Sequence, residues 1–155
     1  MTDAKALTRI VAFFENIVPG DVTRIGEIYA TDAYFRDPFN EVHGVAAIAR
    51  VYAHMFEQLD ECRFVITETV ADGEGALIIW DFTFRSRDWR PRQLQVIHGA
   101  SHIKLTANGK IVYHRDYWDA AEELYAKLPL IGALLRFLRR RLASRTFDTA
   151  PVDPR

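Results

Sequence analysis

The sequence predicts an α+β fold, in which a curved antiparallel sheet wraps around three N-terminal helices and a helical extension follows at the C-terminus. Two observations carry this prediction. Apolar residues recur at helical spacing over most of the chain before residue 60, and four long segments rich in β-branched and aromatic residues follow between residues 62 and 119. Helices followed by a meander of strands are typical of the α+β class, and this layout leaves a cavity between the helices and the sheet.

Three helices are predicted ahead of most of the sheet. The first ends at Pro19-Gly20, because proline and glycine interrupt the helical pattern there. A short second helix is expected from Asp21 to Tyr29, with its apolar residues facing inward. Gly44 opens the third helix, which again carries apolar residues at helical spacing.

One short strand and four long ones complete the predicted domain. The short strand lies in DAYFRDPFN and ends at Asp37-Pro38, since proline cannot donate to a strand ladder. The long strands are expected within CRFVITETV, GALIIWDFTFR, RQLQVIHGASHIKL and KIVYHRDYWD. Their connectors, ADGEG, SRDWRP and TANG, are short enough for antiparallel neighbours.

The last strand carries a candidate site. In GKIVYHRDYWD, residues 109–119, apolar, aromatic and charged residues alternate, and side chains two positions apart share one face of a strand. One face therefore carries His114, Asp116 and Trp118. Two titratable side chains beside an indole indicate that this face lines a pocket.

A dimer face is predicted on the other side of the sheet. The assumed register places an apolar row outward on one strand and two histidines outward on the next, namely Ile78, Trp80, Phe82 and Phe84 with Val96, His98 and His102. Monomers rarely expose such a patch, so a homodimer through this face is expected. The two histidines are four residues apart on one strand, about 13 Å, and cannot share a metal ion, so no metal site is predicted.

The chain after residue 121 is predicted to form an amphipathic helical extension over 122–145, followed by a disordered tail over 146–155. Leucines recur there at spacings of three and four, and the arginines fall mostly off that stripe. Such a helix packs on its own domain, on a partner subunit or on an anionic membrane surface. Burial in protein is favoured, because amphipathic helices usually bury their stripe that way, and no stable membrane association is expected.

Composition narrows the classes of function. A chain of 155 residues with 49% hydrophobic content can bury one good core, so a single domain is expected over 1–121. The net charge of -1 argues against a general nucleic-acid binder, and the lone Cys62 excludes an internal disulfide and a cysteine-built zinc site. The N-terminus shows no apolar signal region, which points to the cytoplasm. Without a glycine-rich phosphate loop, no nucleotide or other cofactor is predicted.

Four stretches together resemble a known superfamily. GD at 20–21, IYATDAYFRDPF, HGVAAI and GKIVYHRDYWD occur in the order and spacing of the nuclear transport factor 2-like proteins, which include ketosteroid isomerase, the SnoaL-type polyketide cyclases and limonene epoxide hydrolase. The resemblance covers about residues 3–119. It implies a cone-shaped, curved antiparallel sheet closed by three helices, commonly dimeric through the outer face of the sheet.

The resemblance to ketosteroid isomerase is incomplete at the reacting positions. The proton-shuttling aspartate that precedes a proline in that enzyme falls on Asp37. The tyrosine of its oxyanion hole falls on Phe13, and the protonated aspartate beside it falls on Ser101. Phenylalanine cannot donate a proton to an enolate and a serine hydroxyl donates weakly, so the comparison argues against steroid isomerisation.

The last strand is similar to that of limonene epoxide hydrolase. The water-activating aspartate of that enzyme falls on Asp116 and the second aspartate of its relay on Asp81. The arginine between them falls on Ile79, while the water-holding tyrosine and asparagine fall on Phe35 and Asp37. Without that cation, epoxide hydrolysis by the same mechanism is not supported. SnoaL-type cyclases also place an acid/base aspartate on this strand, which again fits Asp116.

The expected site joins carboxylates, a histidine and apolar walls. Its candidate catalytic residues are Asp116, Asp37, His114 and Asp81. Its expected ligand-binding residues are Phe13, Phe35, Tyr52, Ile79, Ile97, Ser101, Ile103 and Trp118. Carboxylates crowded in an apolar cavity raise one another's pKa, and an adjacent histidine can hold or relay the proton.

Several functions remain open from the sequence. The first is a cofactor-free enzyme of isomerase, cyclase or hydrolase type that acts on an apolar steroid-, terpenoid- or polyketide-like molecule. The second is a noncatalytic binding module for such a molecule, and the third is an interaction scaffold. The residues also allow structural roles: Asp37 can cap its loop through backbone amides, Asp116 can pair with an arginine, and His114 can be a hydrogen-bonded core histidine.

Overall fold

The chain divides into two compact units in a computed structural model, residues 1–119 and residues 120–155. The structure describes residues 4–88, 90, 92–123, 125 and 129–142. The tail predicted over 146–155 lies outside these residues. The first unit holds the sheet, and the candidate site is built from it alone.

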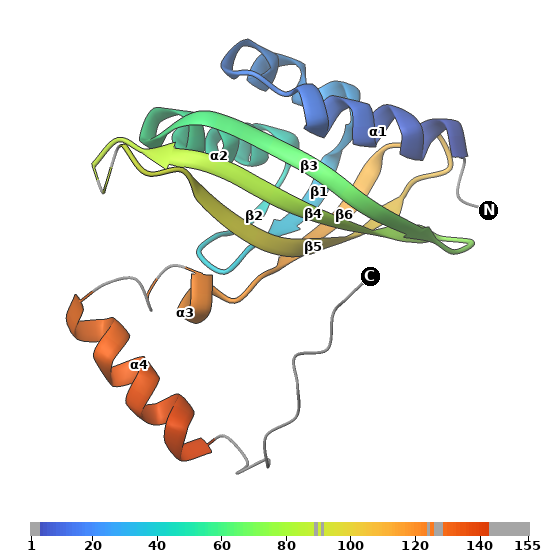
Figure 1. Ribbon diagram of the computed structural model, residues 1–155. Coiled ribbons are helices and arrows are strands. Elements are labelled where there is room, and N and C mark those ends of the chain that lie inside the picture. The colour runs from blue at the N-terminus through green and yellow to red at the C-terminus, as the bar shows by residue number, and fades with distance from the viewer. Residues whose placement is uncertain (1–3, 89, 91, 124, 126–128, 143–155) are drawn as a thin grey trace. The chain divides into compact units, whose positions relative to one another are not determined.

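The first unit confirms the predicted α+β class with a curved sheet. Its elements are α1 (Ala4–Asn16), the 3-10 helix η1 (Pro19–Glu27), β1 (Tyr29–Arg36), β2 (Glu41–His43), α2 (Val45–Gln58), β3 (Leu59–Ala71), β4 (Gly75–Ser86), β5 (Gln95–Leu105) and β6 (Ile111–Tyr117). Figure 1 shows α1 and α2 on the same side of the curved sheet. The second unit contains α3 (Ala120–Glu123) and α4 (Pro129–Leu142).

The six strands form one sheet in the order β2-β1-β6-β5-β4-β3. Neighbouring strands are antiparallel except β1 and β6, which run parallel with Phe35 beside His114 and Arg36 beside Arg115. The parallel pair differs from the purely antiparallel sheet that the sequence predicted. Because carboxyl ends of parallel strands meet at one edge, this pairing places the end of β1 beside the end of β6.

The second helix lies two residues nearer the N-terminus than predicted and is a 3-10 helix, η1 (Pro19–Glu27). The segment expected to be helical from Asp21 to Tyr29 is the 3-10 helix η1, and the carboxylate of Asp21 accepts a hydrogen bond from the backbone amide of Val18 at 3.1 Å. Tyr29 begins β1 instead, beside Ile111 of β6, and is almost fully buried. Its side chain faces inward as expected, but from the sheet rather than from a helix.

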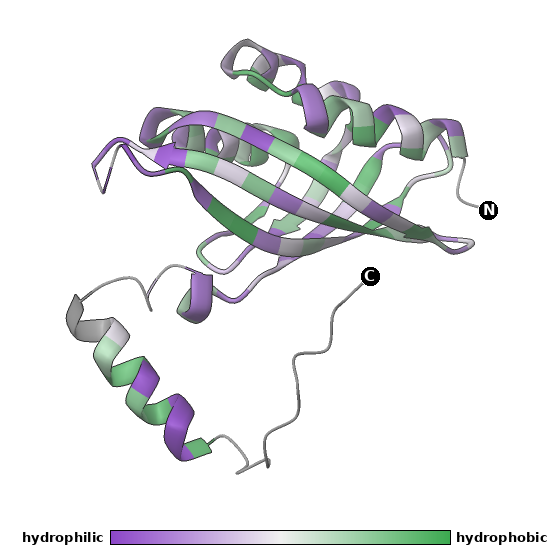
Figure 2. Ribbon diagram, in the orientation of Figure 1, coloured by the Kyte–Doolittle hydropathy of each residue, from purple (hydrophilic) through white to green (hydrophobic). Residues whose placement is uncertain are grey.

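The large apolar residues of β4 form the core. Ile78, Trp80, Phe82 and Phe84 are only 2% to 7% exposed, and the ring of Phe82 stacks on Phe64 of β3 with centroids 4.4 Å apart. Figure 2 shows apolar and polar residues alternating along these strands. The prediction that this row faces outward is therefore wrong. These side chains fill the space between the sheet and the helices.

The error is one of register. Ile78 lies opposite Ser101, and Phe82 lies opposite Ile97, so the row shares the inner face with the residues expected in the cavity. Because the side-chain period of a strand is two, a slip of one residue exchanges its faces. Ile79 and Asp81 consequently lie on the outer face, not in the cavity. The homodimer stays a prediction, but the apolar row that motivated it is buried within the subunit.

Candidate functional site

A buried histidine at the centre of β6 organises the candidate site. His114 is 3% exposed, and its Nδ1 lies 2.5 Å from the hydroxyl of Tyr29. Its Nε2 lies 2.8 Å from Oδ1 of Asp116, two residues along the same strand. Side chains two apart on a strand share a face, and the parallel pairing of β1 with β6 supplies the tyrosine from a neighbouring strand. The sequence placed His114 and Asp116 on one face of this strand, and in the structure the two side chains meet there.

A second arm of hydrogen bonds reaches Asp116 from β4 and β5. The hydroxyl of Ser101 donates to Oδ1 of Asp116 at 2.5 Å, and Nε1 of Trp80 donates to Oγ of Ser101 at 2.8 Å. Trp80 fits because its cross-strand neighbour is Gly99. A Cβ at that position would lie 2.3 Å from Cη2 of the indole. The glycine thus permits an indole to lie across β5 and support Ser101.

One arrangement of the protons lets the hydrogen bonds from Tyr52 through Tyr29 and His114 to Asp116 all run in one direction. The hydroxyl of Tyr52 lies 3.3 Å from that of Tyr29, and burial raises the pKa of both tyrosines, so both stay protonated over the physiological range. If Tyr52 donates to Tyr29, then Tyr29 donates to Nδ1 of His114. The histidine proton then sits on Nε2 and is donated to Asp116. In that arrangement the donors of the indole, the serine, the histidine and both tyrosines form two chains of hydrogen bonds that end at Oδ1 of Asp116.

An aromatic cage surrounds the histidine ring. Tyr29 stacks on it with ring centroids 5.9 Å apart, while Phe14 and Phe35 meet it edge-on at 5.8 Å and 5.1 Å. Within the described residues, the other partners of the imidazole are the hydrogen-bonded groups already named. The sequence allowed two structural roles here: a hydrogen-bonded core histidine at His114, and a pairing of Asp116 with an arginine. His114 is a fully hydrogen-bonded core histidine, but Asp116 pairs with it and not with an arginine of the described chain.

Asp116 connects this buried network to a cavity of about 520 Å³ at the ends of β1 and β6. Its side chain is 17% exposed, whereas that of His114 is 3% exposed. Oδ1 accepts both hydrogen bonds described above, and Oδ2 accepts none from the described residues. The cavity is lined by Arg36, Asp37, Pro38, Arg115, Asp116, Tyr117, Trp118 and Asp119. Oδ1 is thus held by His114 and Ser101, whereas Oδ2 has no hydrogen-bond partner among the described residues.

Asp37 also lines this cavity, but its carboxylate already has partners. Oδ1 accepts hydrogen bonds from the backbone amides of Phe39 and Asn40 at 2.7 Å and 2.6 Å, and the side-chain amide of Asn40 donates to both oxygens. This is the loop-capping role before Pro38 that the sequence allowed. Asp37 is therefore a weaker candidate base than Asp116, because accepting a proton from a ligand would compete with the hydrogen bonds that its carboxylate accepts within the turn.

Asp81 does not join the site. It lies on the outer face of β4, where its Oδ1 is 2.5 Å from Nδ1 of His98 on β5. His98 and Asp81 are 68% and 37% exposed. Ile79 lies on the same outer face, so neither residue belongs with Asp116, and both predictions are corrected by the register described above.

The remaining predicted ligand-binding residues separate into two groups. Phe35, Tyr52, Ile97, Ser101 and Ile103 are buried in the interior, and Phe13 packs at its edge against Phe14. Trp118 lines the cavity beside Asp116 and meets the ring of Phe39 edge-on.

Tyr29 and Trp80 belong to the network and were not predicted. Their signals were present: Tyr29 lies in a β-prone run, and Gly99 interrupts a strand where a bulky neighbour needs space.

The described residues give no sign of a metal centre or a membrane span. No group of three or more of their His, Cys, Asp or Glu side chains is placed to hold a metal ion. No helix among them is both long and apolar enough to cross a bilayer.

Comparison with known proteins gives a family and several structural relatives. The family model for the SnoaL-like domain matches residues 10–114. No curated protein sequence matches the chain significantly. A protein from Catenulispora acidiphila with a ketosteroid isomerase-like fold, solved in complex with trimethylamine, is 17% identical with a TM-score of 0.68, over 83% of this chain and 96% of that one.

Two further structures illustrate the range of activities on this fold. A protein from Jannaschia assigned as a SnoaL-like polyketide cyclase is 14% identical with a TM-score of 0.67, over 78% of this chain and 90% of that one. An epoxide hydrolase of M. tuberculosis, similar to limonene epoxide hydrolase, is 17% identical with a TM-score of 0.63, over 90% of this chain and 96% of that one. At such identities the likeness concerns the fold alone.

Proposed function

Because this chain belongs to the SnoaL-like domain family, with the cone-shaped nuclear transport factor 2-like fold, we propose that it is a cofactor-free acid/base enzyme acting on an apolar small molecule. The family includes cyclases, isomerases and epoxide hydrolases. The observation that carries the proposal is the environment of Asp116. Its Oδ1 is fixed by His114 and Ser101, and its Oδ2 is free of described partners beside a cavity.

The geometry suits a proton shuttle. Through Oδ2, Asp116 takes a proton from a substrate carbon and returns it to another position of that substrate. In a hydrolysis it takes the proton from a water molecule whose oxygen bonds to a substrate carbon, and it gives that proton to the substrate oxygen whose bond to the carbon breaks. His114 and Ser101 keep the carboxyl group in place through both steps, because their donors remain on Oδ1. Tyr29 in turn fixes the imidazole, since its hydroxyl meets the opposite ring nitrogen at 2.5 Å. Asp116 is the catalytic residue in this scheme, and His114, Ser101 and Tyr29 are positioning residues.

The cavity restricts the class of substrate. Trp118 offers aromatic surface to the cavity beside Asp116, and Arg36 and Arg115 contribute cations to its lining. The interior behind Asp116 is filled by Phe14, Phe35 and other aromatic side chains. A ligand therefore enters from the open ends of β1 and β6 and places its reacting atoms against Oδ2, rather than penetrating the cone.

The aromatic surface of Trp118 in the cavity also supports the second function that the sequence left open, a noncatalytic binding module. In that case the cavity would hold an apolar molecule against Trp118 without proton transfer. Mass spectrometry of gently extracted protein would separate the two, because a binding module retains its ligand unaltered. An enzyme would release a product isomeric with the added compound or differing from it by one water molecule.

The experiment that tests the enzyme proposal uses a matched pair of aspartates. Cyclic enolisable ketones and aliphatic epoxides are screened for protein-dependent deuterium incorporation or hydrolysis, and any reaction found is repeated with Asp116→Asn and Asp81→Asn. General acid–base catalysis contributes about 10²–10⁴-fold, so Asp116→Asn should lose that much rate. Asp81→Asn, on the outer face, should retain it. Equal rates in wild type and Asp116→Asn would refute the proposed role of Asp116.

A further inference from the structure

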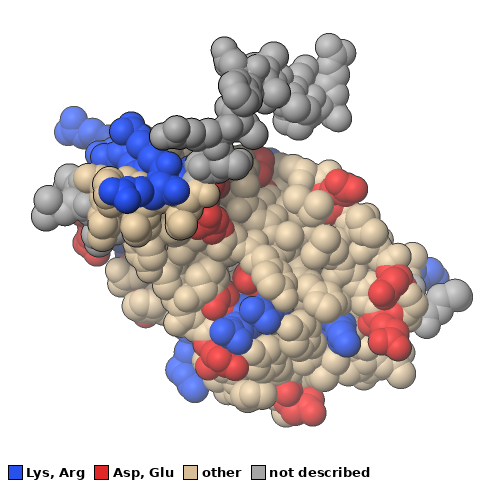
Figure 3. All heavy atoms as spheres, turned by 90° about the horizontal axis from the view of Figure 1, so that it is seen from below, with Lys and Arg blue, Asp and Glu red and all other residues tan. Residues whose placement is uncertain are grey.

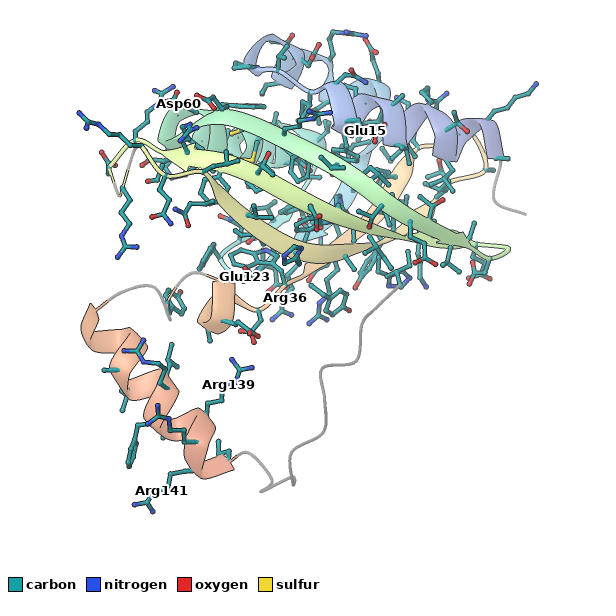
Figure 4. All side chains as sticks on the ribbon, in the orientation of Figure 1. Glu15, Arg36, Asp60, Glu123, Arg139 and Arg141 are labelled. Atoms are coloured by element: carbon teal, nitrogen blue, oxygen red, sulfur yellow. The ribbon has the colours of Figure 1, made fainter. Side chains whose placement is uncertain are left out.

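Two arginines lie side by side where the parallel strands β1 and β6 end. Arg36, the last residue of β1, is paired in register with Arg115 of β6. Each follows a buried residue of the inner face, Phe35 or His114, so both arginine side chains leave the outer face of the sheet. Figure 4 shows Arg36 on the side of the sheet opposite α1. Both arginines line the cavity that also reaches Asp116.

Two cations in register favour an anion that contacts both of them. Neighbouring strands lie about 4.8 Å apart, so like charges on adjacent strands repel each other. Nε of Arg36 lies 3.9 Å from Oε2 of Glu41, which is longer than a hydrogen bond, and the two side chains are 45% and 56% exposed. The guanidinium of Arg115 lies over the ring of Tyr117, 4.7 Å from its centroid. A guanidinium has five N–H donors in one plane, so these contacts leave donors for a further acceptor.

The lining of the cavity combines three kinds of surface. The outer face of the sheet contributes the guanidinium groups of Arg36 and Arg115. The inner face contributes Asp116, whose Oδ2 has no hydrogen-bond partner among the described residues, and Trp118 adds aromatic surface. The volume of about 520 Å³ is within the range of small-molecule sites, so one molecule can reach all three. Such a molecule has an anionic end and an apolar body.

We propose that the substrate is an apolar molecule with one carboxylate, which Arg36 and Arg115 bind while the apolar body packs on Trp118. This inference rests on the proposed acid/base function and assigns the two arginines as the residues that determine its substrate specificity. The paired N–H donors of a guanidinium match the two oxygens of a carboxylate, which makes such contacts strong and directional. Holding the carboxylate at one end of the cavity fixes which atom of the molecule meets Oδ2 of Asp116.

Ligands of other charge fit this lining less well. Asp37, Asp116 and Asp119 also line the cavity, so every additional negative charge on a ligand is repelled. A phosphate group carries up to two negative charges at neutral pH, whereas a carboxylate carries one. An amine would be attracted by the aspartates but would lie beside two guanidinium groups. On the surface in Figure 3, several Lys and Arg side chains lie beside Asp and Glu side chains, which again favours a singly charged group over a polyanion.

The test is an NMR titration of the full chain with probes that share one aromatic body and differ in charge. Naphthylacetic acid, which is ionised at neutral pH, should shift the backbone amide signals of residues 115–119. It should bind on the order of ten- to a hundredfold more tightly than the neutral naphthylacetamide, as expected for hydrogen bonds to a charged group. The naphthylmethylamine cation and the naphthylmethylphosphonate anion should both bind more weakly than the acid.

A matched pair of double variants assigns the binding to the two arginines. Arg36→Gln with Arg115→Gln should lower the affinity for the acid to that of the amide and change the affinity for the amide less than about threefold. The control, Arg50→Gln with Arg63→Gln, removes the same charge from exposed positions outside the cavity and should change the affinity for the acid less than about threefold. Absence of acid binding, equal binding of acid and amide, tighter binding of the amine or the phosphonate, or full acid affinity in the Arg36 and Arg115 variant would overturn the inference.

Asp116→Asn separates this inference from the acid/base proposal. It removes a carboxylate from the cavity and neither arginine, so it should bind the acid at least as tightly as the wild type while any reaction found is lost. If the rate persisted in Asp116→Asn but acid binding still needed the arginines, only the proposed role of Asp116 would be refuted. If Asp116→Asn lost the rate but carboxylated and neutral ketones reacted equally fast in the wild type, only the carboxylate specificity would be refuted.

Discussion

The sheet carries two aspartate–histidine pairs on opposite faces, and their contrast explains which one is suited to chemistry. On the inner face, Asp116 and His114 are 17% and 3% exposed, with Oδ1 and Nε2 2.8 Å apart. On the outer face, Asp81 and His98 are 37% and 68% exposed, with Oδ1 and Nδ1 2.5 Å apart. The residue types are the same, but the inner pair is joined through Nε2 of the histidine and the outer pair through Nδ1. Water screens the outer pair, while the inner pair is held by a tyrosine, a serine and an indole.

Exposure sets the energetic weight of each pair. An exposed ion pair loses most of its attraction to solvent and salt, so removing it changes stability little. Removing one member of a buried pair leaves a hydrogen-bond donor or acceptor of its partner unsatisfied. The buried surroundings hold no water that could take the place of the lost group. The inner pair should therefore behave as part of a network, and the outer pair as two separate surface residues.

The largest expected effect comes from removing each histidine in turn. His114→Ala removes one of the two hydrogen-bond partners of the Tyr29 hydroxyl and one of the two donors to Oδ1 of Asp116, and it opens a cavity inside the aromatic cage. It should lower the free energy of unfolding by about 3–5 kcal/mol, measured by urea denaturation. His98→Ala should change it by no more than about 0.5 kcal/mol. Equal effects of the two substitutions would mean that the inner network does not exist in solution.

The next effect tests the arm through Trp80. Gly99→Ala would place a Cβ 2.3 Å from the indole and force it away from Ser101. Overpacking of this kind costs about 1–3 kcal/mol, again measured by urea denaturation. Gly73→Ala is the matched control, because no atom lies within 4 Å of a Cβ built there. An unaltered stability in Gly99→Ala would show that the indole is not confined across β5.

A smaller effect is expected for Tyr29, whose contribution to the free energy of unfolding depends on pH. Burial raises the pKa of Tyr29 well above its ordinary value of 10.0, so the folded chain favours the protonated phenol. The contribution of this preference to the free energy of unfolding is fully present below pH 10. It is lost as the pH rises above 10, because the tyrosine of the unfolded chain ionises before that of the folded chain. Tyr29→Phe should cost about 1–2 kcal/mol at neutral pH through its unpaired neighbours. Between pH 10 and about 12 it should lose stability less steeply than the wild type.

Much of the fold followed from sequence patterns because those patterns are local. Helical spacing identified α1 and α2, and alternation in residues 109–119 placed His114 and Asp116 together on the inner face. The class of fold and the superfamily were predicted correctly on that basis. These inferences needed only the side-chain period of each element and the order of the elements along the chain.

The errors arose where a position depends on its partner strand. Asp81 and Ile79 were assigned to the cavity through correspondence with a relative, although the apolar row Ile78, Trp80, Phe82 and Phe84 already identified the buried face of that strand. Tyr29 was placed on a helix because its apolar neighbours fit either period. Its role as the partner of His114 depends on the parallel pairing of β1 with β6, which joins residues 85 positions apart and leaves no mark in either segment alone.

The central claim is tested most directly by measuring which ring nitrogen of His114 carries the proton. Long-range ¹⁵N–¹H correlation spectra of the full chain, labelled at histidine nitrogen, distinguish the two tautomers without any substrate. The network predicts that the neutral His114 carries its proton on Nε2, with Nδ1 as the acceptor from Tyr29, and that this pattern changes in Tyr29→Phe. A proton on Nδ1 of the neutral His114 would contradict the account, because Asp116 would then receive no hydrogen bond from the histidine and Oδ1 would not be fixed.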